Sequence, residues 1–312
     1  MKRNAFLWVV VSAAAVAATL AAGAVYGAWT YEGQWGSRGR ANGHFMGPYG
    51  VGVAPNGNVY VADTENDRVQ YFTSTGSFRG KWGNQGTGNG EFNSPRGIAV
   101  APSGNVYVAD MNNDRIQYFT ANGSFLGKWG TSGSGDGQFR FPTDVAVSLM
   151  GSVYVADRGN SRLQYFTLTG SFTGKWGSRP FDPYGVAVNR DDVIYVSDCD
   201  NHRINSWGTR GSGNGQLEYP HDLAVAPNGN VFVADWGNHR IQYFKPSGSF
   251  LGKWGEYGTG AGEFDSPSDV ALSLSGARAY VADTGNHRVQ YFNRNAPAVA
   301  PTSLGRVKAL FR

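Results

Sequence analysis

Residues 229–255 read GNVFVADWGNHRIQYFKPSGSFLGKWG, and the 312-residue chain is organised around copies of this stretch. The apolar core of each copy ends at an aspartate. Those aspartates are Asp63, Asp110, Asp157, Asp198, Asp235 and Asp283, at spacings of 47, 47, 41, 37 and 48 residues. A period of this size indicates one supersecondary unit repeated in tandem. Positions identical in all six copies are expected to build the fold, whereas a functional site is sought at positions that differ.

Each copy predicts four short β-strands joined by tight turns. In the fifth copy the apolar or aromatic runs are residues 222–226, 231–235, 240–244 and 250–254. The turns between them are residues 227–229, 237–238 and 246–248. Proline presets φ and Asn-Gly accepts positive φ, so these turns favour an antiparallel meander. One such sheet is too small to be stable alone and must stack on its neighbours.

Six meanders of about 44 residues each predict an all-β fold, a six-bladed β-propeller of four-stranded antiparallel blades. The sixth copy stops at residues 289–292 without a fourth strand. A matching strand stands at the other end of the repeats, where residues 31–36 have the spacing of residues 250–255. We therefore expect the N-terminal strand to join the last blade and close the ring, which hides the sheet edges.

The fourth copy departs from the pattern. Trp207 follows Arg203 after four residues, whereas Trp254 follows Arg240 after fourteen. About one strand and one turn are missing, so this blade is expected to have three strands and an exposed outer edge. Such an edge can recruit a strand from a partner; a deletion without function is the alternative.

The repeated pattern is similar to one known family. D-x-x-N-H-R-[IV]-Q-Y-F followed by G-x-F-x-G-K-W-G resembles the NHL repeat, in particular its exported bacterial and archaeal members. The resemblance covers nearly all of residues 29–293. Membership of this family implies a six-bladed propeller, the same fold that the period and the strand count predict.

Charge and cysteine content exclude several classes of function. Six of the 27 basic residues lie in the first 28 or the last 19 residues, which contain no acid. The body between them has 21 basic and 23 acidic residues, a net charge of −2, whereas a nucleic-acid surface shows a clustered positive excess. Nucleic acid is therefore disfavoured as a partner. Cys199 is the single cysteine, so the chain has neither a disulfide framework nor a Cys/His zinc site.

The chain divides into residues 1–28, 29–293 and 294–312. The first part has a positive start and 20 uncharged residues, typical of a secretory signal peptide; an uncleaved transmembrane anchor is the alternative. Either one places the repeats outside the cytoplasm: secreted, periplasmic or on the cell surface, with membrane attachment only through an uncleaved leader. The last part is a Pro/Ala spacer and a basic segment, which is a frayed tail or a sorting signal.

Positions shared by the copies are interpreted as structure. Every copy has an arginine five residues after its aspartate, a spacing suited to charge-assisted bonds at a turn. One tryptophan per blade is expected to pack between blades. These tryptophans are Trp35, Trp82, Trp129, Trp176, Trp207 and Trp254. His202, His239 and His287 share one turn position, but equivalent turns of neighbouring blades are too far apart to share a zinc ion.

Two positions vary between copies while their flanks do not, and in a propeller both are expected on the same face. The first follows the proline before the inner strand and is Tyr49, Arg96, Thr143, Tyr184, His221 or Ser268. The second follows the repeated aspartate and is Thr64, Met111, Arg158, Cys199, Trp236 or Thr284. Tyr, Trp and Arg are enriched at binding hot spots, so these residues form a candidate binding face. Unselected variation of surface positions is the alternative.

A second ring of positions concerns metals. Asp144, Asp222 and Asp269 stand where the other copies have glycine, at positions 50, 97 and 185. Three carboxylates facing one channel are candidate ligands for Ca²⁺; capping of turns is the alternative. We expect no cofactor; Ca²⁺ or Zn²⁺ is the alternative.

The chain lacks G-x-S-x-G, H-E-x-x-H and a phosphate-binding loop with its lysine. We therefore expect a non-enzymatic interaction scaffold that binds a protein, peptide or glycan. Some NHL-like propellers resemble peptide-amidating lyases, streptogramin lyases or lactonases, which implies a rival enzyme using His221, Tyr49, Tyr184, Arg96 and Asp222. Animal NHL proteins act as ubiquitin ligases or RNA binders, but one cysteine excludes a RING finger here.

Overall fold

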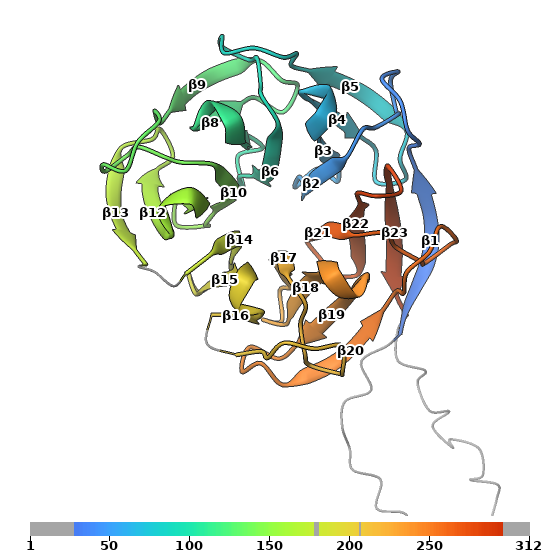
Figure 1. Cartoon of the computed structure of the whole chain (residues 1–312). Helices are drawn as coiled ribbons and strands as arrows, with labels where there is room; N and C mark the ends of the chain where they lie inside the picture. The colour runs from blue at the N-terminus through green and yellow to red at the C-terminus, as the bar shows by residue number, and fades with distance from the viewer. Residues whose placement is uncertain (1–27, 178–180, 206, 296–312) are drawn as a thin grey trace, which may run out of the picture.

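The computed structural model describes residues 28–177, 181–205 and 207–295, which form six antiparallel sheets around a central channel (Figure 1). The predicted six-bladed, all-β propeller is confirmed. Nearly all of the predicted leader and most of the tail lie outside the described residues. Within the part of the chain described, no helix is long and apolar enough to cross a membrane.

In each complete blade the first strand lies at the channel and the next three follow outwards. The first blade has β2 (Pro48–Val53), β3 (Val59–Asp63), β4 (Arg68–Phe72) and β5 (Phe78–Trp82). The second has β6 (Pro95–Val100), β7 (Val106–Asp110), β8 (Arg115–Phe119) and β9 (Phe125–Trp129). The third has β10 (Pro142–Val147), β11 (Ser152–Asp157), β12 (Arg162–Thr167) and β13 (Phe172–Trp176).

The fourth blade has three strands, as the shortened fourth copy predicts. They are β14 (Pro183–Val188), β15 (Ile194–Asp198) and β16 (Arg203–Ile204). The fifth has β17 (Pro220–Val225), β18 (Val231–Asp235), β19 (Arg240–Phe244) and β20 (Phe250–Trp254). Five short 3-10 helices follow the second strands: η1 (Thr64–Asn66), η2 (Met111–Asn113), η3 (Arg158–Asn160), η4 (Cys199–Asn201) and η5 (Trp236–Asn238).

The ring closes through the N-terminal strand. The sixth blade joins β21 (Pro267–Leu272), β22 (Arg278–Asp283) and β23 (Arg288–Arg294) to β1 (Trp29–Trp35). Strands β1 and β23 are antiparallel, with Trp35 opposite Val289, and Trp29 stacks on Trp254 of the fifth blade at 5.3 Å between ring centroids. The predicted closure is therefore confirmed, and Figure 1 shows blue β1 beside red β23.

Packing between blades forms the core. The second strand of the first, second and fifth blades is buried along its whole length, because neighbouring sheets cover both of its faces. Trp82 contacts Phe119 of the next blade at 5.5 Å between ring centroids, and Trp129 contacts Phe166 in the same way. Trp176 is the exception to the predicted packing. It is 38% exposed, since the three-stranded fourth blade has no phenylalanine at the matching position.

The repeated aspartate is the centre of a buried hydrogen-bond network. Asp110 accepts bonds from the Arg115 Nε at 2.6 Å, from the side chains of Asn113 and Gln117, and from the backbone N–H of Asn93. The guanidinium of Arg115 also donates to three backbone carbonyls of the loop before β6. The first, third, fifth and sixth blades repeat this arrangement. In these five blades the aspartates and arginines therefore hold the loops to the blades, as the repetition predicts, whereas in the fourth the Arg203 side chain pairs with Asp198 but is 42% exposed.

The repeated turn histidines have a structural role as well. His202, His239 and His287 adopt positive φ, and each Nδ1 accepts a backbone N–H from the following blade at 3.0 Å. In the first two blades an aspartate oxygen at the same position accepts the equivalent bond. Each of these turns therefore links one blade to the next.

The outer edge of the fourth blade is capped by one side chain. Asn205 accepts the backbone N–H of Val196 through Oδ1 at 2.6 Å and donates to the carbonyl of Ile194 through Nδ2 at 3.0 Å. These are groups of β15 that β16 is too short to pair. The amide side chain occupies positions that a recruited strand would need, which favours a tolerated deletion over strand recruitment.

Replacing Asn205 by alanine is expected to destabilise the protein and expose this edge. Loss of a partner for buried or half-buried backbone groups costs about 1–3 kcal/mol. Unpaired strand edges promote association between copies. Urea unfolding and size-exclusion chromatography at increasing concentration measure the two effects. An Asn205→Ala protein with unchanged stability and elution would contradict the capping role, and Asn122→Ala on an exposed turn is the matched control.

Candidate functional site

Six of the residues at the variable positions meet at one end of the channel. We call them the mouth cluster: Tyr49, Arg96, Arg158, Tyr184, His221 and Trp236. Tyr49, Arg96, Tyr184 and His221 are each the second residue of an inner strand, and Arg158 and Trp236 begin η3 and η5. Because the inner strands converge on one axis, side chains from five blades come into contact there. The face that carries this cluster is called the mouth face below.

Aromatic stacking and cation–π contacts hold the mouth cluster together. The His221 ring stacks on Tyr184 at 4.2 Å, with 7° between the planes, and on Trp236 at 4.9 Å. The Arg96 guanidinium lies 4.5 Å from the centre of the Tyr49 ring, and that of Arg158 lies 4.7 Å from the centre of the Tyr184 ring. Such contacts contribute about 0.5–2 kcal/mol each, depending on desolvation.

A series of hydrogen bonds runs through the cluster. Arg96 Nη1 donates to the hydroxyl of Tyr184, which also bonds the hydroxyl of Tyr49. The Tyr49 hydroxyl lies 2.9 Å from Nδ1 of His221. All partners are satisfied when Tyr184 donates to Tyr49 and Tyr49 donates to Nδ1, which places the imidazole proton on Nε2. The hydrogen bonds are therefore all donated in one direction, from Arg96 through the two tyrosines to His221.

The electrostatics of the cluster keep its titratable groups neutral, apart from the arginines. Burial, and then the charges of Arg96 and Arg158, hold the pKa of His221 well below its usual range. Burial also raises the pKa of Tyr49 and of Tyr184, and the nearby Arg96 opposes this effect. At neutral pH the imidazole is uncharged and both phenols keep their protons. His221 is 7% exposed and Tyr184 5%, so the cluster closes the channel at this end.

Two further residues at the variable positions support the cluster from below. Ser268 Oγ donates to the carbonyl of Tyr49, and Thr143 Oγ1 donates to the carbonyl of Tyr184, both at 2.7 Å. Their side chains are buried. They therefore fix the backbone beneath the two tyrosines and present little surface to a ligand.

Beside the cluster lies a pocket of about 580 Å³, here called the side pocket, between the second, third and fourth blades. Arg96 and Arg158 border it, together with Met111, a further candidate of the predicted binding face. Arg158 donates through Nε and Nη2 to the two carboxylate oxygens of Asp182, at 2.9 and 3.1 Å. This ion pair neutralises one of the two arginines that border the side pocket.

Several pocket residues were not among the predicted candidates. Phe141, Phe181 and Asp182 line the side pocket, and Phe141 is 50% exposed. Phe141 and Asp182 directly precede the prolines of β10 and β14. The residue before that proline differs in nearly every copy, and this variation is the signal that could have identified them.

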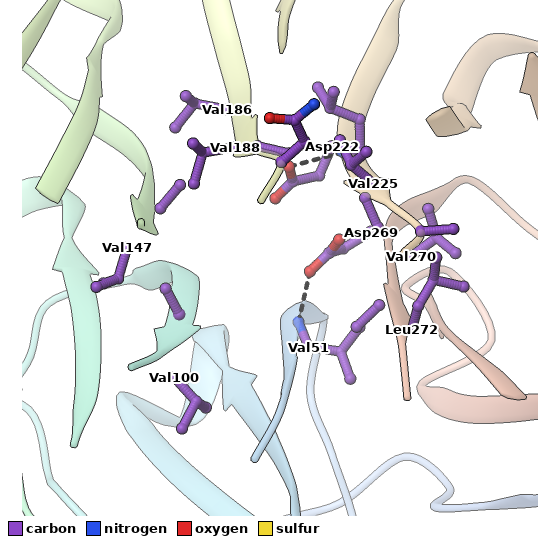
Figure 2. Close-up of a pocket in the computed structure, with 18 of the residues that line it drawn as sticks. Val51, Val100, Val147, Val186, Val188, Asp222, Val225, Asp269, Val270 and Leu272 are labelled. Carbon is purple, nitrogen blue, oxygen red and sulfur yellow. Dashed lines mark hydrogen bonds between the residues drawn. The ribbon is translucent and has the colours of Figure 1, made fainter. Parts of the chain in front are cut away.

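At the opposite end of the channel a cavity of about 560 Å³ reaches from the loop residues Leu149 and Leu274 to Asp144, Asp222 and Asp269. Figure 2 shows its aliphatic wall, with the carboxylates of Asp222 and Asp269 directed inwards. Asp144 accepts the backbone N–H of Val186 at 2.7 Å, and Asp269 that of Val51 at 2.6 Å. Each carboxylate thereby holds the inner strand of another blade.

The metal hypotheses are assessed by ligand geometry. Among the described residues, Asp182, Cys199 and Asp200 are the group whose potential ligand atoms lie within 4.8 Å of one another. Asp182 is already paired with Arg158, and burial raises the pKa of the Cys199 thiol to about 12, which disfavours the thiolate that a metal requires. The three channel aspartates form no such group among these residues. Nothing in the fold or the described side chains requires a cofactor.

Fold and site define the class of this protein: a six-bladed β-propeller whose scaffold residues repeat and whose mouth residues vary. The family model of the NHL repeat matches residues 45–72, 92–119, 139–166, 182–204, 217–244 and 264–292. These matches cover more than half of the chain, so it belongs to the NHL-repeat family. No curated protein sequence matches it.

Solved structures with the same fold have low sequence identity. A Bacteroides thetaiotaomicron protein of unknown function has a TM-score of 0.65 at 15% identity, covering 84% of this chain and 76% of its own. A streptogramin B lyase has 0.59 at 14%, covering 86% and 98%. Virginiamycin B lyase from Staphylococcus aureus has 0.57 at 14%, covering 80% and 96%. At these identities the similarity concerns the fold alone.

Proposed function

We propose that this protein is an exported, non-enzymatic binding scaffold that takes a protein, peptide or glycan at its mouth face. One observation carries the proposal: the side chains that differ between blades form one continuous cluster next to a pocket, whereas the repeated side chains are used in the scaffold. Tyr, Trp and Arg dominate the cluster, and these residues are enriched at the centres of binding interfaces. Export would depend on the leader, which would act as a signal peptide or as a membrane anchor.

Burial of the polar groups supports binding over catalysis. A general base must reach a proton of the substrate. His221 is 7% exposed, and the rings of Tyr184 and Trp236 both stack on it. Arg96, Trp236 and Met111 are half-buried and border solvent or the side pocket. These are the side chains that a ligand would contact first.

Replacing Tyr49, Arg96 and Trp236 together by alanine is expected to abolish partner recovery in a pull-down with the full chain. Loss of two or three hot-spot side chains costs about 2 kcal/mol or more each, which is a factor of ~30 or more in affinity. Arg79→Ala with Leu126→Ala, two exposed outer-strand positions, is the matched control. Thermal unfolding verifies that both variants fold. Equal recovery by folded wild type and triple variant would exclude the mouth face as the site.

A lyase-like enzyme is the second candidate, favoured by the hydrogen-bonded series from Arg96 to His221. Neutral His221 and the two phenols offer proton donors and acceptors in a row, and two streptogramin-type lyases share the fold. Metal analysis of the purified protein tests this candidate. If the protein contains a stoichiometric metal ion and His221→Ala loses it, the binding-scaffold proposal is rejected in favour of an enzyme with a metal at the channel mouth.

A further inference from the structure

We propose that the side pocket binds a peptide carboxylate, with an apolar side chain of the same peptide packed against Met111 and Phe141. The inference rests on the proposed function and names the ligand class of that face. Three observations carry it: only one of the two arginines has an ion pair, the charges that line the pocket limit the charge of a ligand, and one wall of the pocket is apolar.

The first observation is the unequal pairing of Arg96 and Arg158. Arg158 uses Nε and Nη2 to hold both carboxylate oxygens of Asp182. Arg96 has no ion pair in the described part of the chain, and its one hydrogen bond goes from Nη1 to the Tyr184 hydroxyl. Its Nε is buried without a hydrogen-bond partner. A carboxylate that reaches this guanidinium from the pocket would accept from N–H groups that the described residues leave unbonded.

The second observation is the net charge of the pocket. Its charged lining consists of Arg96, Arg158, Asp182 and Asp200, which sum to zero. One guanidinium therefore remains without a counter-charge in contact with it, while two carboxylates stand nearby. The sum leaves no excess of positive charge, so the attraction for an anion comes from the unpaired Arg96, and a singly charged carboxylate adds the least negative charge to the pocket. A phosphate, with a charge of about −1.5 to −2, would be repelled more strongly than a carboxylate by Asp182 and Asp200. A chain of several phosphate groups would be repelled more strongly still.

The third observation is the apolar surface next to the cation. Phe141 is 50% exposed, and Met111 and Phe181 are half-buried beside it. An aromatic or aliphatic side chain that covers them gains about 25 cal/mol per Å² of apolar surface removed from water. A sugar ring offers less apolar surface than a phenylalanine or leucine. An acidic residue next to an apolar one in a peptide satisfies both parts of the pocket.

Isothermal titration calorimetry of the full chain with short acetylated peptides tests the proposal. Gly-Phe-Glu-Gly amide carries the acid on a side chain, and Gly-Gly-Leu-Phe with a free C-terminus carries it on the main chain. Gly-Phe-Gln-Gly amide, Gly-Ala-Glu-Gly amide, Gly-Phe-phosphoserine-Gly amide and glucuronic acid are the comparison ligands. We expect one of the first two to bind, and the neutral, Ala-containing and phosphorylated peptides and glucuronic acid to bind about ten-fold more weakly or not at all.

Variants then assign the binding to the pocket. Arg96→Gln should weaken binding about ten-fold or more, and Arg96→Lys should restore little because it lacks the fork. Arg79→Gln, on an exposed outer strand, should leave binding unchanged. Failure of both acidic peptides at millimolar concentration, equal binding by Arg96→Gln, or preference for the phosphopeptide or the uronate would overturn the proposal. If the mouth-face triple variant still loses its partner, the proposed function survives that outcome.

Discussion

Replacing Asp144, Asp222 and Asp269 together by asparagine is expected to remove a large part of the pH dependence of stability between pH 5 and pH 8. Burial raises the pKa of Asp144 to about 7, against about 3.9 in an unfolded chain. Burial and the neighbouring carboxylates also raise the pKa of Asp222, and burial with the charge of Asp144 raises that of Asp269. The folded protein therefore binds protons more tightly than the unfolded chain at these three positions.

The direction of the effect follows from proton linkage. Where the folded pKa is raised, the stabilisation is complete below about pH 4 and is lost as the pH rises through 7. For Asp144 alone this loss is about 2–3 kcal/mol between pH 5 and pH 8. Asparagine keeps the acceptor oxygen for the backbone N–H of Val186 but does not titrate. The variant should thus lose less stability than the wild type over this range.

Urea unfolding at pH 5, 6, 7 and 8 measures the difference between the two proteins. Carboxylates elsewhere titrate equally in both and cancel in the comparison. Asp191→Asn, at an exposed turn, is the matched control and should follow the wild type. Parallel curves for the wild type and the triple variant would show that the channel carboxylates are ionised in the folded protein across the whole range.

Asp110→Ala is expected to lower the free energy of unfolding by about 3–5 kcal/mol, because it leaves a buried guanidinium without its counter-charge. Asp110 is 0% exposed, and it accepts bonds from Arg115, Asn113, Gln117 and a backbone N–H. All of these donors lose an acceptor at once.

Asp136→Ala is the matched control for this substitution. Asp136 pairs with Lys175 at the surface, where the two side chains are 52% and 46% exposed, and such pairs contribute about 0–1 kcal/mol. Chemical denaturation of the three proteins under identical conditions gives the comparison. A loss below about 1 kcal/mol for Asp110→Ala would contradict the structural role that the six-fold repetition assigns to this residue.

Much of the fold could be predicted from the sequence because the repeat supplies six comparisons within one chain. Turn residues such as Pro227 and Gly229 separate the strands, and the incomplete sixth copy indicates the closure by residues 31–36. The ten residues missing after Arg203 predict the three-stranded blade. In each case the pattern within one copy is enough to predict the contact. The contact is either a hairpin or a strand pairing that the other blades repeat.

The candidate site could be predicted only as a set of positions. Repetition places Tyr49, Tyr184 and His221 at equivalent points of three inner strands, but it does not state which side chains touch across the axis. The pairing of Arg158 with Asp182 depends on two different loops, one of which belongs to the shortened blade. The repeat predicts that Trp176 packs between blades. Its exposure arises because the neighbouring fourth blade is shortened, a feature that the sequence of the third copy does not contain.

Closure by β1 also determines when the ring can be completed during synthesis. Residues 29 and 294 are paired, so β1 cannot pair until β23, the last strand, has been synthesised. Hairpins within each blade are local and can form while the chain grows, whereas a contact spanning some 265 residues carries a large loop-closure cost and forms slowly. Until then the nascent protein is an open arc with an unpaired strand edge, a species prone to aggregation. Any truncation before β23 would make that arc the final product.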